Sequence, residues 1–120
     1  MKQRPILAAI AVLMVALTSS LGCSDPPPDP SCSPWCMVVA DCTSTDFSRC
    51  MSECATELSN AQFVSSECAD AVRSQNNCLA ELACQEFDAW RQQDPPDGYP
   101  CKDADDEVRN TCFAERSELL

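Results

Sequence analysis

The chain has 120 residues, 11 cysteines, no histidine and a formal charge of −11. This length predicts one small domain, and so many cysteines are typical of exported chains that depend on disulfides. The absence of histidine excludes catalysis by a serine or cysteine that needs a histidine base, and it excludes zinc sites with mixed histidine and cysteine ligands. The strong negative charge argues against nucleic acid as a partner.

The amino terminus has the layout of an export signal. Lys2 and Arg4 form a short positive region, and residues 6–17 are an unbroken apolar run. The run is shorter than the roughly 20 residues that a membrane-spanning helix needs. We therefore expect residues 1–22 to be a signal peptide that is removed on export. Its removal leaves 6 basic and 19 acidic residues, a charge of −13.

A cysteine directly follows the predicted signal peptide. The stretch Ser20–Cys23 (SLGC) resembles the lipobox of bacterial lipoproteins. Gly22 fits the family pattern, whereas Ser20 and Leu21 replace its preferred leucine and small residue. The resemblance implies that the Cys23 thiol is acylated and anchors the chain in the cell envelope; secretion with cleavage nearby is the alternative. Since Ser24 is not the aspartate that marks inner-membrane retention in some bacteria, the resemblance also implies the outer membrane.

A spacer rich in proline and aspartate separates Cys23 from the next cysteine. Residues 24–31 (SDPPPDPS) predict an extended tether, which at about 3.1 Å per residue holds the domain about 25 Å from the membrane. We assign residues 23–31 to the lipidated cysteine and tether and residues 32–120 to a cysteine-rich domain. Binding of the proline-rich segment to a partner groove is the alternative. This layout resembles the small cysteine-rich lipoproteins of myxobacteria, a likeness that implies no activity.

The composition of the domain is helical, because it has a single glycine and no isoleucine. We expect an all-α domain of two helical hairpins stapled by disulfides. A first helix is predicted from Ser33, an N-cap followed by Pro34, to Cys42. Residues 43–45 offer a turn and a new N-cap, with Asp46 in the first turn of a second helix. The apolar face of that helix comprises Phe47, Cys50, Met51, Cys54 and Leu58.

Two cysteine pairs at C-x3-C spacing predict the first hairpin. Cysteines at i and i+4 lie on one side of a helix, so two antiparallel helices can form two rungs. We predict Cys36–Cys50 and Cys32–Cys54. This part of the chain resembles the alpha-hairpinins, small plant peptides that are cross-linked in the same nested way. Some of them inhibit serine proteases through a basic residue in the loop, but residues 43–46 hold no lysine or arginine.

The second hairpin is predicted from wider cysteine spacing. Ser65 or Ser66 caps a third helix, residues 94–100 reverse the chain, and Asp103 caps a last helix. The apolar faces of these two helices are Cys68, Ala71, Val72, Cys78, Leu79 and Leu82, and Val108, Cys112 and Phe113. Ten cysteines remain after lipidation of Cys23, enough for five disulfides. The spans of the helices match for Cys68–Cys112 and Cys78–Cys101, at about 15 to 16 Å each. Cys42–Cys84 then remains, in one connectivity among the many that spacing allows.

Few groups suited to chemistry remain, so we assign no catalytic residue, metal site or cofactor. The chain has no C-x2-C motif and no glycine-rich phosphate loop. The acids Asp103, Asp105, Asp106 and Glu107 have the oxygens that calcium prefers, but they lack the glycine and distal glutamate of an EF-hand loop. They are explained as the first turn of a helix. Paired acids for glycoside hydrolysis are disfavoured in so small a domain.

Aromatic residues are the candidates for a partner surface, since they dominate binding hot spots. We single out Trp90 and Tyr99; packing on the disulfides with Trp35 and Phe87 is the alternative. The sequence predicts a non-catalytic binding or structural lipoprotein of the cell envelope, with an unknown protein or envelope partner. A thiol-redox or metal-handling protein is one alternative, and an exported inhibitor or toxin of the hairpin type is a weaker one.

Overall fold

The computed structural model describes residues 27–113, so the predicted signal peptide and Cys23 lie outside the described residues. Within this range the chain is all-helical and has no strand, which confirms the predicted fold class. The helices are α2 (Cys32–Cys42), α3 (Phe47–Val64), α4 (Ser66–Leu79), α5 (Cys84–Gln92) and α6 (Lys102–Cys112).

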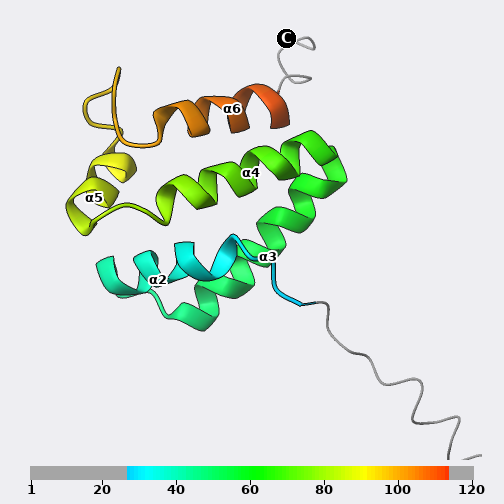
Figure 1. Ribbon diagram of the computed structural model, residues 1–120, viewed down its shortest axis with the longest axis horizontal. Coiled ribbons are helices and arrows are strands. Elements are labelled where there is room, and N and C mark those ends of the chain that lie inside the picture. Colours follow the sequence, from blue (N-terminus) through cyan, green and yellow to red (C-terminus); the bar gives the residue numbers. More distant parts are fainter. Residues whose placement is uncertain (1–26, 114–120) are drawn as a thin grey trace, which may run out of the picture.

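The helix α4 is the centre of the domain. It contacts α6 on one side and the hairpin of α2 and α3 on the other, and α5 lies beyond the end of α4 (Figure 1). The helices α4 and α6 are antiparallel, because disulfides join the start of each to the end of the other. The two hairpins therefore stack on each other, and α5 bridges them at one end.

Side-chain caps start α3 and α4. The Asp46 carboxylate accepts a hydrogen bond from the Arg49 backbone N–H at 3.3 Å, so Asp46 is the N-cap of α3 and does not lie in its first turn. Thr43 instead ends α2, where its hydroxyl donates to the Val39 carbonyl. The hydroxyl of Ser65 accepts from the Cys68 N–H at 3.0 Å, as predicted for a cap of this helix.

Two predicted helix starts are wrong. The helix α2 begins two residues earlier than expected, with Ser31 in place of Ser33 at the N-cap. Pro34 is tolerated because N–H groups of the first turn have no intrahelical partner. Asp103 does not cap α6, since that helix starts at Lys102 after Cys101 in the left-handed conformation (φ 62°). Cys101 is joined to Cys78 by a disulfide, a constraint from a distant residue that a local sequence pattern does not contain.

Five disulfides take the place of a larger apolar core. They join Cys32 to Cys54, Cys36 to Cys50, Cys42 to Cys84, Cys68 to Cys112 and Cys78 to Cys101, which are the same five pairs that the spacing predicts. Half-cystines make up much of the buried set, with Leu58, Val72 and Leu79 among its few large aliphatic side chains. Cross-links of this kind are what small domains with limited apolar burial need for stability.

The end of the predicted tether is fixed on α4. The Asp29 carboxylate accepts from the Arg73 guanidinium at 2.8 Å and from the backbone N–H of Ser31 at 2.9 Å. The Ser31 hydroxyl in turn accepts from the buried amide of Asn76 at 3.2 Å. Burial opposes ionisation of Asp29, but the hydrogen bonds from Arg73 and Ser31 outweigh it and lower the pKa of Asp29 below 3.8. Residues 29–31 therefore belong structurally to the domain.

Candidate functional site

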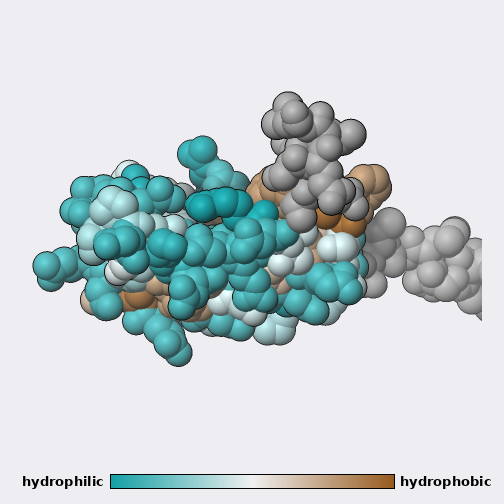
Figure 2. Space-filling model, turned by 90° about the horizontal axis from the view of Figure 1, so that it is seen from above, coloured by the Kyte–Doolittle hydropathy of each residue, from teal (hydrophilic) through white to brown (hydrophobic). Residues whose placement is uncertain are grey.

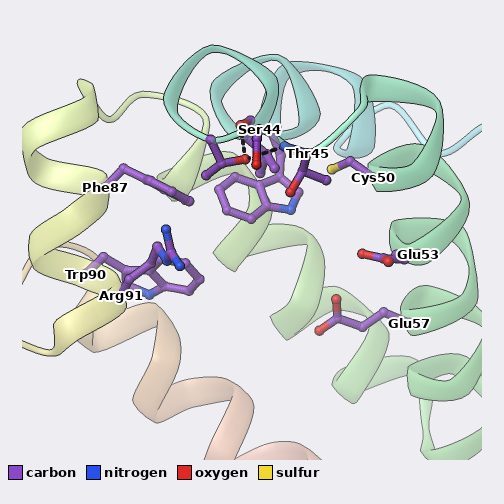
Figure 3. A pocket seen from close by; sticks show the side chains of 11 residues that line it. Ser44, Thr45, Cys50, Glu53, Glu57, Phe87, Trp90 and Arg91 are labelled. Atoms are coloured by element: carbon purple, nitrogen blue, oxygen red, sulfur yellow. Dashed lines mark hydrogen bonds between the residues drawn. The ribbon is translucent and has the colours of Figure 1, made fainter.

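An open groove of about 590 Å³ lies between α3 and α5 (Figure 3). We call it the aromatic groove. One wall carries Phe87, Trp90 and Arg91 of α5, and the other carries Glu53 and Glu57 of α3. The rest is lined by Cys50 of α3 and by side chains of α2 and of the loop after it: Trp35, Val39, Thr43, Ser44 and Thr45.

Three aromatic rings form a cluster at one side of this groove. The ring centroids of Trp35 and Phe87 are 5.6 Å apart, and those of Trp35 and Trp90 are 5.7 Å apart in an edge-on arrangement. Phe87 and Trp90 complete the triangle at 5.7 Å. These separations are those of favourable aromatic pairs. Phe87 is buried, whereas the two indoles are half-buried and keep part of their surface on the groove.

A hydrogen-bond network behind the groove holds the Trp90 ring in place. The indole N–H of Trp90 donates to both carboxylate oxygens of Asp105, at 3.1 and 3.0 Å. The Gln75 side chain donates to the same carboxylate at 2.6 Å. Asp105 therefore links α5, α4 and α6, and the aromatic wall is preorganised by contacts outside the groove.

The disulfide Cys42–Cys84 attaches the aromatic wall to the first hairpin. It joins the last residue of α2 to the first residue of α5. Cys84 is exposed and Cys42 half-buried, so this cross-link lies nearer the surface than the buried rungs of the first hairpin. The position of α5 against α2 depends on this covalent link as well as on the contacts of Trp35.

The charged side chains of the groove lie on opposite walls. Glu53 pairs with Arg49 at 3.0 Å on the exposed face of α3. Burial raises the pKa of the Glu57 carboxyl above 4.5, although the residue keeps contact with solvent at the rim. The Arg91 guanidinium lies 5.7 Å from the centroid of the Phe87 ring, within the range of a cation–π contact.

The two residues singled out for a partner surface are placed differently. Trp90 lines the aromatic groove. Tyr99 is 5% exposed, so its ring does not belong to an exposed surface. Burial, with the nearby Asp105 carboxylate, raises the pKa of Tyr99. Sequence reasoning missed Glu53 and Glu57 as members of this site, although their i, i+4 spacing places them on one face of a helix.

Two of the four acidic residues at the start of α6, Asp105 and Asp106, have structural partners. Asp105 holds Trp90 and Gln75, and Asp106 pairs with Lys102 at 2.6 Å. In the part of the chain that the structure describes, no group of three or more histidine, cysteine or acidic side chains is arranged to hold a metal ion. Asp103 and Asp105 lie in the first turn of α6.

A second, smaller hollow of about 180 Å³ lies where α3 meets α4 and α6 ends. Its lining is mainly apolar and includes Val72, Val108 and Phe113. Phe63 and Val64 are exposed beside it, at 93% and 56%. Figure 2 shows hydrophobic surface gathered at this end of an otherwise hydrophilic face. Phe113, predicted on an apolar helix face, is half exposed here, and Phe47 is also exposed.

Comparisons with known proteins give no relative: no protein-family model matches the chain, and no curated protein or solved structure matches it significantly. None of the helices described between residues 27 and 113 is long and apolar enough to cross a membrane. The fold and site thus define a small all-helical domain, stapled by five disulfides, with an aromatic groove on one side.

Proposed function

We propose that this chain is an exported lipoprotein whose disulfide-stapled domain is a non-catalytic binding module displayed on the cell envelope. The aromatic groove carries this proposal. It combines concavity, two partly exposed indoles and a few charged side chains, which are the features of ligand sites. Its walls are held by a disulfide and by the Asp105 network, so little ordering is required on binding.

The proposed anchor is an acyl group on Cys23, in the outer membrane. Two features support it: the lipobox-like SLGC stretch and the pairing of the other ten cysteines. Since these ten cysteines pair with one another, none of them is a disulfide partner for Cys23. The docking of Asp29 on Arg73 fixes the point from which the tether leaves the domain.

One observation favours the thiol-redox alternative. Cys84 is exposed, so Cys42–Cys84 is accessible to a thiol reductant. A redox function then requires that the Cys42–Cys84 disulfide is reduced while the other four disulfides remain oxidised.

Intact mass of the protein purified from membranes tests the proposal, with thiol alkylation before and after reduction. We expect acyl mass on Cys23, no alkylation before reduction, and ten alkylated cysteines after it. A Cys23→Ser variant, which lacks the acyl acceptor, is expected in the soluble fraction and is the matched control. Unmodified Cys23 with release into the medium contradicts the anchor. Two alkylated cysteines before reduction make the redox alternative the leading one.

A further inference from the structure

Glu57 is an acidic group of the aromatic groove that forms no ion pair within the described residues 27–113. It lies one turn after Glu53 on α3, and both line the groove. Glu53 is paired with Arg49, whereas no ion pair within residues 27–113 involves Glu57. Glu57 is exposed, so its carboxylate is accessible to a cation bound in the groove.

The opposite wall of the groove already holds a cation. The Arg91 guanidinium lies over the Phe87 ring at 5.7 Å, and Trp35 and Trp90 are packed against the same ring. The faces of aromatic rings attract ammonium and guanidinium groups, with tryptophan the strongest. This contact places one cationic side chain against the aromatic cluster at the groove.

We propose that the aromatic groove binds a primary ammonium or guanidinium group carried on an apolar stem. This is the chemistry of a lysine or arginine side chain and of a free aliphatic amine. The stem packs on the indoles of Trp35 and Trp90, and the charged end meets Glu57. The charge of −13 on the exported chain attracts such ligands and repels anions. The inference rests on the proposed function, because it assigns a ligand class to the same groove.

Arg91 is then a competitor for the ligand. Its guanidinium occupies an aromatic face beside the groove, and its charge opposes a second cation. Removal of this side chain frees the ring face and removes the repulsion. A ligand with a carboxylate facing Arg91 has the opposite dependence, since it loses its partner when Arg91 is removed. The sign of the Arg91→Ala effect therefore separates a cationic ligand from an anionic or zwitterionic one.

Titration calorimetry on the full-length chain in non-ionic detergent tests the assignment. Three probes share one scaffold and differ in charge: Nα-acetyl-lysine amide, its neutral Nε-acetyl form and Nα-acetyl-glutamate amide. We expect binding of the positive probe alone. Glu57→Gln is expected to weaken it about fivefold, and Arg91→Ala to strengthen it about threefold. The control Glu107→Gln removes the same charge from α6, away from the groove, and is expected to leave binding unchanged.

Several results overturn the inference. Equal weakening by Glu57→Gln and Glu107→Gln means that overall charge, not the groove, attracts the probe. Tighter binding of the neutral or negative probe means that the groove takes another ligand class, which contradicts the inference and leaves the proposed binding module intact. Failure of all three probes contradicts the inference directly. The acyl mass of the same preparation reports separately on the proposed anchor.

A fourth arm identifies the source of the cation. A blocked tripeptide with lysine between two glycines presents the ammonium group as a protein does, and 1,5-diaminopentane presents it as a free amine. Tighter binding of the tripeptide supports a protein partner, and tighter binding of the diamine supports a small-molecule ligand. In both cases Glu57→Gln is expected to weaken binding of the tighter probe, as it does for the lysine probe.

Discussion

The indole N–H of Trp90 donates to both carboxylate oxygens of Asp105, at 3.1 and 3.0 Å, and thereby ties α5 to α6. These residues lie on opposite sides of the loop that reverses the chain before the last helix. A hydrogen bond to a charged group is stronger than a neutral one, and this one is partly shielded from water. The network that shapes one wall of the aromatic groove is thus built by an acid outside the groove.

Loss of the Asp105 carboxylate is expected to loosen the aromatic wall. Asp105→Ala removes the acceptor of both Trp90 and Gln75, and we expect a loss of about 1–3 kcal/mol in the free energy of unfolding. Release of Trp90 toward water is expected to shift tryptophan emission to longer wavelength. Asp105→Asn keeps one carbonyl acceptor, so its effects are expected to be smaller. Unchanged emission in Asp105→Ala contradicts a positioning role for this carboxylate.

The disulfide Cys42–Cys84 is expected to contribute more to the groove than to the helices. Replacement of both cysteines by serine removes the link between α2 and α5 but leaves the two rungs of each hairpin. We expect helical circular dichroism to persist and the free energy of unfolding to fall by about 2–4 kcal/mol. The near-ultraviolet signal of Trp35 and Trp90 is expected to weaken, because their contact joins α2 to α5.

A second double variant is the control for this prediction. Replacement of Cys32 and Cys54 by serine removes a buried rung within the first hairpin, and neither cysteine lines the groove. We expect it to lower the helical signal itself, because two buried positions become polar. If both double variants lose helix equally, the separation between groove and scaffold is not supported.

The helical class and the alignment of cysteine rungs within each hairpin were accessible from the sequence because they depend on the regular spacing of residues along a helix, although that spacing left other connectivities open. Cysteines one turn apart share a helix face, and equal helix spans match the rungs of antiparallel helices. Helix starts were less accessible, because the residues at these starts have partners far along the chain: Cys101 forms a disulfide with Cys78, and the Ser31 hydroxyl accepts from Asn76. These constraints come from residues distant in the chain.

The candidate site was accessible only in part. An aromatic residue can lie in a groove or in the interior, and spacing alone does not separate the two. Trp90 lies at the groove, where its indole N–H donates to the Asp105 carboxylate, whereas Tyr99 is buried. Glu57 gains its role from the facing helix α5, which the sequence of α3 does not reveal.

The contact between the tether and α4 predicts a stability term that depends on pH. The pKa of Asp29 is lowered below 3.8 in the folded domain, so the unfolded chain binds a proton more readily. The stabilisation is therefore present above about pH 4 and is lost as pH falls through the folded pKa. We expect Asp29→Asn to lose about 1 kcal/mol at pH 7, a small value because Arg73 is 39% exposed.

Urea unfolding between pH 2 and pH 7 measures this difference. The curves of the wild-type and Asp29→Asn chains are expected to converge at the acidic end. Asp88→Asn is the control, since it removes a carboxylate from the exposed surface of α5. A constant difference at all pH values means that Asn cannot replace the shape of the aspartate, and it rejects the linkage argument.

The ionised Glu57 carboxylate is expected to lower the free energy of unfolding, whereas the Asp29 carboxylate raises it. Burial raises the pKa of Glu57 above 4.5, so the folded domain binds a proton more readily than the unfolded chain. Stability from this group is therefore greatest at acid pH and declines as pH rises from about 4.5 through the folded pKa. Glu53 and Arg91 are the other charged side chains that line the groove, and they act in opposite directions on the ionisation of the Glu57 carboxylate.

Glu57→Gln is accordingly expected to unfold at higher temperature than the wild-type chain at pH 7 and to match it below pH 4. Thermal unfolding followed by circular dichroism checks this, with Glu107→Gln as a control of equal charge. A variant that gains stability while its affinity for the lysine probe falls identifies Glu57 as a residue retained for binding; a destabilised Glu57→Gln domain contradicts that role.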